Sequence, residues 1–207
     1  MLFPTANFIF LTILGYLLGS IPWGHLISKV KRINIREVGS GNIGATNVSR
    51  ALGKKWALLV GVLDLAKGIV PAFLALQFLS QGWAIALVAI SPILGHIFPV
   101  WLKFKGGKGV ATTSGVLFVL LGWKIFLILF LIWLLILVIS RIMSFTNLLM
   151  TSFFPLILWL SSFSLVYFIL GIILFCLIWW AHRENLQRIK EGREPKFKLK
   201  KTLSQAQ

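Results

Sequence analysis

The stretch WKIFLILFLIWLLILVI at residues 123–139 decides the fold class of this chain. Only Lys124 interrupts an otherwise apolar run, whose length as an α-helix is close to the thickness of a hydrocarbon core. Hydrophobic residues make up 58% of the 207 residues, and only five residues are acidic. A soluble domain of this size would have to cover itself with polar groups. The sequence therefore predicts an all-α protein embedded in a membrane.

Apolar segments of similar character lie on both sides of this stretch. They predict a polytopic bundle of about seven transmembrane helices, although the segment at 110–121 is only about 18 Å long as a helix and too short to span alone. Because the segment at 145–160 holds Asn147 and Pro155, a five-span alternative that merges or demotes the weak segments stays open. The seven segments are 4–27, 56–78, 82–101, 110–121, 123–139, 145–160 and 165–181.

The basic residues that give the chain its formal charge of +16 are placed unevenly. They concentrate at 29–55, at 103–108 and from residue 183 onward, while the turns near Gln81 and Ser162 have none. Because Lys and Arg collect in cytoplasmic loops, we expect an outside N-terminus, a cytoplasmic C-terminus and an odd number of spans. Loops of this kind account for the charge without nucleic acid, which we do not expect as a partner.

The chain shows no internal repeat and no low-complexity tract. We expect one integral membrane domain at residues 1–196, followed by a basic cytoplasmic tail at residues 197–207. Asp64 and Lys67, three residues apart inside an apolar segment, are predicted to pair with each other, since buried charges in a membrane are costly when unpaired.

The first polar cluster is GSGNIGATNVSR at residues 39–50. Its glycines permit positive φ and close approach of the backbone, and successive N–H groups in such a loop can cradle an anion. The guanidinium of Arg50 suits a phosphate, which a plain flexible linker, the alternative interpretation, would not need. The candidate residues are Ser40 and, for binding a substrate phosphate, Gly41, Asn42, Thr46, Asn47 and Arg50.

The second cluster is GHIFPVWLKFKGGKGVATT at residues 95–113. It has the physical features of a phosphate loop but lacks the GxxxxGK[ST] spacing of a Walker A motif. A short helix predicted to start near Val110 would direct its free N–H groups at this loop. His96 could be an interior histidine, but we place it with the site. The candidate residues are His96, Lys105, Gly106, Gly107, Lys108 and Gly109.

The third cluster, HRENLQRIKEGRE at residues 182–194, directly follows the last apolar segment. His182 and Asn185 share one helical face by their i, i+3 spacing, and Arg188 can join that face. A basic helix that only touches lipid headgroups is the alternative interpretation. No cluster of His, Cys, Asp and Glu has metal-ligand spacing, so we expect neither a metal nor another cofactor.

Together, the stretches at 39–50, 95–112 and 182–194 resemble the acyl-phosphate:glycerol-3-phosphate acyltransferases of bacterial membranes, the PlsY family. The resemblance covers almost the whole chain. It implies a seven-span protein of the bacterial cytoplasmic (inner) membrane with a cytoplasmic active site that makes lysophosphatidic acid for phospholipid biosynthesis. The implied partners are glycerol 3-phosphate, a long-chain acyl phosphate and membrane lipid, and we expect no obligate protein partner.

The residue types suit this chemistry. An acyl phosphate already has a good leaving group, so the site needs positioning and charge stabilisation more than strong acid catalysis. His182 is the candidate general base, and a substrate phosphate is the other possibility. Ser40 has no adjacent base in its motif, so hydrogen bonding is a simpler role than a covalent acyl-enzyme. The catalytic candidates are His182, Ser40, Lys105 and Asn185.

A transporter for a phosphorylated solute is the main alternative, because half-helices, glycine breaks and a basic site also suit transport. Against it, the polar clusters are predicted to lie at one face of the membrane. A lipid-binding scaffold would explain the basic tail but not the two glycine-rich loops.

Overall fold

The computed structural model describes residues 3–197, and all regular elements in that range are helical. The predicted all-α class is therefore confirmed for the described part of the chain. The α-helices are α1 Phe3–Ser20, α2 Trp23–Val30, α3 Ala45–Leu52, α4 Lys54–Phe78, α5 Gly82–Ile97, α6 Val110–Ser140, α7 Met143–Ser152, α8 Phe154–Ser162, α9 Leu165–Ala181 and α10 Arg183–Lys190, and the 3₁₀ turns are η1 Ile35–Glu37 and η2 Val100–Leu102.

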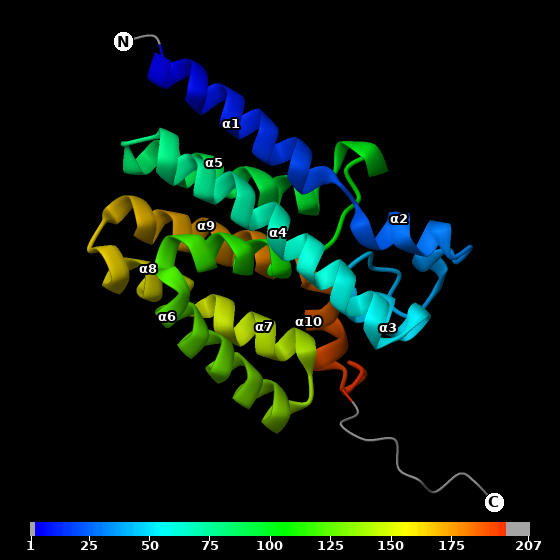
Figure 1. Cartoon of the computed structure of the whole chain (residues 1–207). Helices are drawn as coiled ribbons and strands as arrows, with labels where there is room; N and C mark the ends of the chain where they lie inside the picture. The colour runs from blue at the N-terminus through cyan, green and yellow to red at the C-terminus, as the bar shows by residue number, and fades with distance from the viewer. Residues whose placement is uncertain (1–2, 198–207) are drawn as a thin grey trace, which may run out of the picture.

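The long helices lie side by side and place the polar segments at one end of the bundle (Figure 1). The short helices α2, α3 and α10 gather at that end, whereas the turns between α4 and α5 and between α8 and α9 lie at the opposite end. The polar clusters at 39–50 and 182–194 form α3, α10 and the chain beside them. Segments far apart in sequence are thus collected on one side.

Several helices have the length and apolar character of membrane spans. Four helical segments meet these criteria, and two bent helix pairs, α7 with α8 and α9 with α10, raise the number to six. Within α6, Gly122 has non-helical φ and ψ angles of 74° and 163°, and the two halves of the helix run in different directions (Figure 1). Counting these halves separately would give seven segments. The predicted number of seven spans and the predicted orientation of the termini stay predictions.

The outer surface of the bundle is apolar, as a lipid environment requires. The second half of α6 exposes many large side chains, and a soluble monomer rarely exposes so large a contiguous apolar patch. Examples on this helix are Trp123, Ile128, Leu131, Leu135 and Ile139. The predicted membrane location is thus supported by the way in which the chain is folded.

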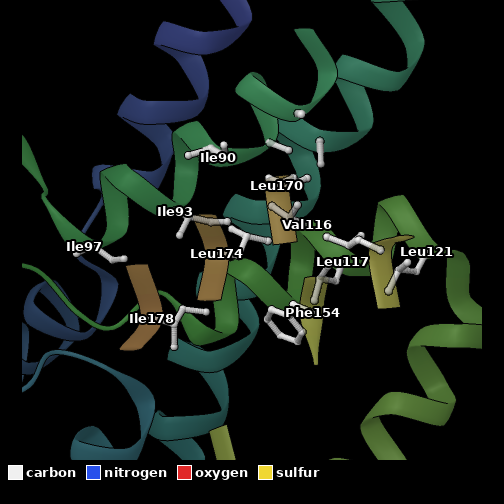
Figure 2. Packing of buried hydrophobic residues seen from close by; sticks show 14 residues of the cluster. Ile90, Ile93, Ile97, Val116, Leu117, Leu121, Phe154, Leu170, Leu174 and Ile178 are labelled. Atoms are coloured by element: carbon white, nitrogen blue, oxygen red, sulfur yellow. The ribbon is translucent and has the colours of Figure 1, made fainter. Parts of the chain in front are cut away.

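The main apolar core lies between α5, α6, α8 and α9 (Figure 2). Ile93, Val116, Leu174 and Ile178 have no exposed surface there. These side chains fix the first half of α6, which begins at the second polar cluster, against α9, which ends at the third. The core therefore sets the relative position of two of the predicted site segments.

Prolines break two apolar segments that were expected to be continuous. The first, predicted at 4–27, ends as α1 at Ser20 and resumes as α2 at Trp23, because Pro22 lacks an N–H and disfavours a helical residue before it. The segment at 145–160 is bent by 41° between α7 and α8, where Pro155 lies in the first turn of α8.

The predicted pairing of Asp64 with Lys67 is confirmed. The Lys67 ammonium lies 3.0 Å from Asp64 Oδ1, and both side chains are buried. Lys67 also donates a hydrogen bond of 2.9 Å to the Ile21 carbonyl at the break before Pro22, and the Trp23 N–H donates to the same carbonyl at 3.1 Å. One buried cation therefore stabilises both a carboxylate in α4 and the α1–α2 corner.

The predicted domain boundary lies near the end of the described chain. The Phe197 N–H donates to the Arg141 carbonyl at 2.6 Å, which ties residue 197 to the end of α6. The rest of the predicted tail, residues 198–207, lies outside the described residues. The single domain at residues 1–196 stays a prediction.

Glycine permits close contact of helix backbones. A Cβ atom added at Gly115 in α6 would lie 2.1 Å from the Leu65 carbonyl oxygen in α4, and one added at Gly68 in α4 would lie 2.0 Å from the Thr112 carbonyl oxygen. Because helices in a membrane associate through packing of this kind, the α4–α6 contact depends on both positions.

We expect Gly115→Ala to lower the melting temperature of the detergent-solubilised protein by several degrees. Overpacking costs about 1–3 kcal/mol, and each kcal/mol shifts the midpoint by about 2–4 °C in a protein of this size. The matched control is Gly61→Ala in α4, where the added Cβ would have only Ala45 Cβ as a neighbour, at 3.8 Å. Equal melting temperatures for the two variants would contradict this packing.

Candidate active site

Asn47 organises the first loop from inside. Its Nδ2 donates to the Val38 carbonyl at 2.8 Å and to the Ile35 carbonyl at 3.2 Å, while its Oδ1 accepts from the Ser40 N–H at 3.0 Å. The side chain is almost fully buried. Asn47 thus holds the Ser40 backbone in place, and its predicted binding of a phosphate stays a prediction.

The remaining candidates of this loop differ in exposure. Asn42 Oδ1 accepts a hydrogen bond of 2.9 Å from the Gly44 N–H, which forms a local turn just before α3. Gly41 has a φ of 66°, a conformation that glycine adopts without strain. Thr46 and Arg50 on α3 are exposed. They are therefore the most accessible of these candidates, while Ser40 and Asn42 are half-buried.

Arg36, which the sequence analysis did not single out, joins the first loop to the second. Its guanidinium donates to the Gly41 carbonyl at 3.4 Å and to the Lys105 carbonyl. The two carbonyls belong to the two glycine-rich loops. Arg36 lies just outside the quoted cluster, so only its proximity to that cluster could have indicated this role.

The second loop folds against the end of α5. The Gly106 N–H donates to the Ile97 carbonyl and the Gly107 N–H donates to the His96 carbonyl, each at 3.0 Å. A Cβ atom at Gly107 would lie 2.2 Å from His96 Nε2, so the ring lies directly beneath this residue. Glycine is needed at 107 for this close approach.

His96 is buried beneath the loop. Its Nδ1 lies 3.3 Å from Thr112 Oγ1 in α6 and 3.7 Å from Asp64 Oδ1 in α4. These contacts are those of an interior histidine that supports the loop. That His96 itself binds a substrate phosphate stays a prediction.

The loop returns to helix at the expected position. Gly109, with a φ of 79°, is the N-cap of α6, which begins at Val110 as predicted. Lys103 and Phe104 both have positive φ, which turns the chain sharply before the glycines. Lys105, just after this turn, has an exposed side chain. The loop thus combines a free cation with the beginning of a helix.

The second and third clusters meet through a network of hydrogen bonds. Lys108 donates to Asn185 Oδ1, and Asn185 Nδ2 donates to Glu194 Oε1 at 2.6 Å. Glu194 also accepts from Ser144 at 2.8 Å and from Arg188 Nε at 2.8 Å. Glu194 was quoted within the third cluster but not chosen as a site residue. The sequence could have indicated its role only by its charge, because Glu194 is one of five acidic residues in a basic chain.

Burial changes the protonation of these groups. It lowers the pKa of the Lys108 ammonium to about 8, a shift that Glu194 opposes and Arg188 reinforces. Burial also acts against ionisation of Glu194, but hydrogen bonds from Arg188, Ser144 and Asn185 outweigh it and lower the pKa of this carboxyl. At neutral pH, Lys108 is therefore mostly a cation and Glu194 an anion.

His182 lies between α9 and α10, where the chain bends by 63°. Its Nδ1–H donates to the Ile178 carbonyl at 2.8 Å, which leaves Nε2 as the acceptor. Burial and the nearby Lys108 ammonium lower the pKa of the imidazole to about 4. His182 is therefore neutral at physiological pH and has a fixed tautomer, as a hydrogen-bond acceptor or base requires.

Direct contacts thus connect all three predicted clusters, through Arg36 on one side and the Lys108–Asn185 contact on the other. Among residues 3–197, no group of three or more His, Cys, Asp or Glu side chains is placed to hold a metal ion. Exposed or half-buried cations border this assembly, with Arg50, Lys105 and Arg188 in three different segments. Such a constellation can neutralise more than one phosphate group.

Known proteins share this sequence and fold. The family model for glycerol-3-phosphate acyltransferase matches residues 9–192. A glycerol-3-phosphate acyltransferase of Aquifex aeolicus (strain VF5) is 43% identical over 91% of this chain and 98% of its own length, and that of Wolbachia pipientis wMel is 42% identical over 89% and 95%.

Solved structures agree with these sequence matches. The chain is similar to a crystal structure of PlsY (YgiH), an integral membrane glycerol 3-phosphate acyltransferase, in its glycerol 3-phosphate form, with 42% identity, a TM-score of 0.88 and coverage of 92% of this chain and 96% of that one. The lysophosphatidic acid form gives 41% identity, a TM-score of 0.85 and coverage of 92% and 95%. This chain therefore belongs to the glycerol-3-phosphate acyltransferase family of integral membrane proteins, the PlsY family.

Proposed function

We propose that this chain transfers a fatty acyl group from acyl phosphate to glycerol 3-phosphate and releases lysophosphatidic acid. The meeting of two glycine-rich loops and a basic helix at one site, within a chain of this family, carries the proposal. Both proposed substrates bear phosphate, which matches the cations on three separate segments. The solved relatives are described as glycerol 3-phosphate and lysophosphatidic acid forms, in agreement with the acceptor and the product.

The choice of acyl phosphate as donor is supported by the kind of groups at the site. An acyl phosphate carries its own leaving group, so the protein has to hold phosphate oxygens and stabilise a developing oxyanion. Lys105, Lys108 and backbone N–H groups can do this. The acyl chain can stay in the lipid beside the helices while its phosphate reaches the loops.

The proton of the attacking hydroxyl needs an acceptor. His182 is neutral and has a lone pair on Nε2, so it can accept that proton or orient the hydroxyl. The other acceptor is a phosphate oxygen of a substrate. Ser40, whose N–H is fixed by Asn47, contributes hydrogen bonds in either mechanism.

We place the site on the cytoplasmic face of the bacterial inner membrane. The support is the alternation of basic loops along the chain, which collect Lys and Arg on the same side as the three clusters. The transporter alternative is not supported, since the matching relatives are acyltransferases. No obligate protein partner is proposed.

The function is tested with the purified protein in detergent, labelled glycerol 3-phosphate and palmitoyl phosphate. We expect lysophosphatidate to form without a membrane potential and without added metal. Palmitoyl-CoA in place of palmitoyl phosphate is expected to give no comparable turnover, because the short glycine-rich loops are predicted to hold phosphate groups. Comparable rates with both donors would contradict the proposed donor, and no product from either would contradict the proposed function.

Substitutions of Lys105 and of His182 are expected to change the kinetics in different ways. Lys105→Met should lower kcat/KM by about tenfold to several hundredfold, because a charge-assisted contact contributes about 1.5–3 kcal/mol. His182→Gln should lower kcat by about a hundredfold or more if His182 is the base. If a substrate phosphate is the base, this variant keeps most of its kcat and loses affinity for glycerol 3-phosphate. Separate measurement of kcat and KM at neutral pH, where the His182 imidazole with its pKa of about 4 is unprotonated, distinguishes the two cases.

Matched controls are available for both variants. Lys103→Met removes a neighbouring exposed lysine of the same loop, and His25→Gln removes a histidine of α2. Both controls should keep nearly wild-type kinetics. Wild-type values for Lys105→Met and His182→Gln, in protein that melts normally, would mean that the site lies elsewhere.

A further inference from the structure

A buried chain of polar contacts runs from the α1–α2 corner to the second glycine loop. It starts at the Ile21 carbonyl, passes through Lys67 and Asp64 in α4 and reaches His96 in α5, with successive distances of 2.9, 3.0 and 3.7 Å. Thr112 in α6 completes it, with its hydroxyl 3.3 Å from His96 Nδ1. Asp64, Lys67, His96 and Thr112 are all buried. We call these four residues the polar chain.

The polar chain ends directly beneath the loop that carries Lys105 and Lys108. The His96 carbonyl accepts the Gly107 N–H at 3.0 Å, and the His96 ring lies where a side chain of residue 107 would be. Movement of the ring would therefore move Gly107. Since Thr112 and Asp64 both approach Nδ1, they restrict the orientation of that ring from two different helices.

Within the polar chain, the Asp64–Lys67 ion pair itself adds little net stability. Replacing a buried ion pair by apolar residues is often neutral or stabilising, because desolvation offsets the attraction between the charges. The Asp64 carboxylate lies within ion-pair distance of Lys67, yet Oδ1 accepts no well-directed hydrogen bond within the described residues. The polar chain instead fixes the position of the His96 ring beneath Gly107. Preorganised supporting contacts of this kind determine how well a binding loop holds its ligand.

We infer that Asp64, Lys67, His96 and Thr112 are positioning residues that hold the loop at 105–109 in the conformation that binds a substrate phosphate. This inference rests on the proposed function. His96 acts through Gly107 and does not need to touch the substrate. The polar chain also explains why charged residues are kept inside the α4 span, far along the sequence from the three polar clusters.

The test uses an isosteric change at the edge of the polar chain. Thr112→Val removes only the hydroxyl that faces His96 and should raise the KM for glycerol 3-phosphate or for palmitoyl phosphate about fivefold, with a smaller effect on kcat. Thr112→Ser keeps the hydroxyl and should restore the KM. Thr113→Val is the matched control, because Thr113 is an adjacent buried threonine whose hydroxyl has no partner in the described part of the chain.

A second variant removes the charges while avoiding an unpaired ion. Asp64→Asn combined with Lys67→Met should melt within a few degrees of wild type, yet it should raise the KM in the same way as Thr112→Val. Hydrogen exchange of the Gly106 and Gly107 amides provides a readout independent of activity. We expect both amides to exchange faster in these variants, while the Asn47 and Val48 amides in α3 exchange as in wild type.

The possible results distinguish a failure of the positioning role from a failure of the proposed function. Faster exchange at Gly106 and Gly107 without any acyltransferase activity in the wild-type protein would keep the positioning role but contradict the proposed function. Unchanged KM values and unchanged exchange in Thr112→Val and in the double variant would overturn the positioning role. An equal effect of Thr113→Val would also overturn it, since that change leaves the contact with His96 intact.

Discussion

The contact between Lys108 and Asn185 connects two segments that are 77 residues apart in the chain. It places a largely buried ammonium, with a pKa lowered to about 8, at the meeting point of the second glycine loop and α10. A cation in such a position is costly unless other groups compensate for its lost hydration. Glu194 provides the compensating charge through Asn185 and draws in Arg188 and Ser144. The geometry of the site therefore depends on this contact and on the carboxylate behind it.

The membrane explains why these polar groups gather at one end. Between the ends, the helices face lipid with Leu, Ile, Phe and Trp and contact one another through glycine, as at Gly68 and Gly115. Such packing leaves little room for polar groups inside the bundle. The Asp64–Lys67 pair is a buried ion pair within the described helices, and it lies where α1 breaks and where His96 supports the loop. The chemistry thus stays in water-accessible loops, while the helices fix the relative positions of those loops.

Most helices could be predicted from the sequence, because long apolar runs and their basic flanks follow directly from the cost of polar groups in lipid. The start of α6 at Val110 and the pairing of Asp64 with Lys67 were predicted from local spacing alone. The break before Pro22 was missed, since the Ile21 carbonyl there is stabilised by Lys67 from another helix. The roles of Arg36 and Glu194 were missed for the same reason: each depends on partners distant in sequence. That Asn47 binds a phosphate stays a prediction, whereas the contacts of its amide with neighbouring backbone groups were not predicted.

A double-mutant cycle on Lys108 and Asn185 tests most directly whether the three segments act as one site. The kcat/KM of Lys108→Met, Asn185→Ala and the double variant would be measured with palmitoyl phosphate and glycerol 3-phosphate. Because hydrogen bonds to charged groups contribute about 1.5–3 kcal/mol, we predict that the double variant is less impaired than the sum of the single variants by at least about 1 kcal/mol. Additivity within about 0.5 kcal/mol would show that the two residues act independently, and it would contradict a site assembled through their contact.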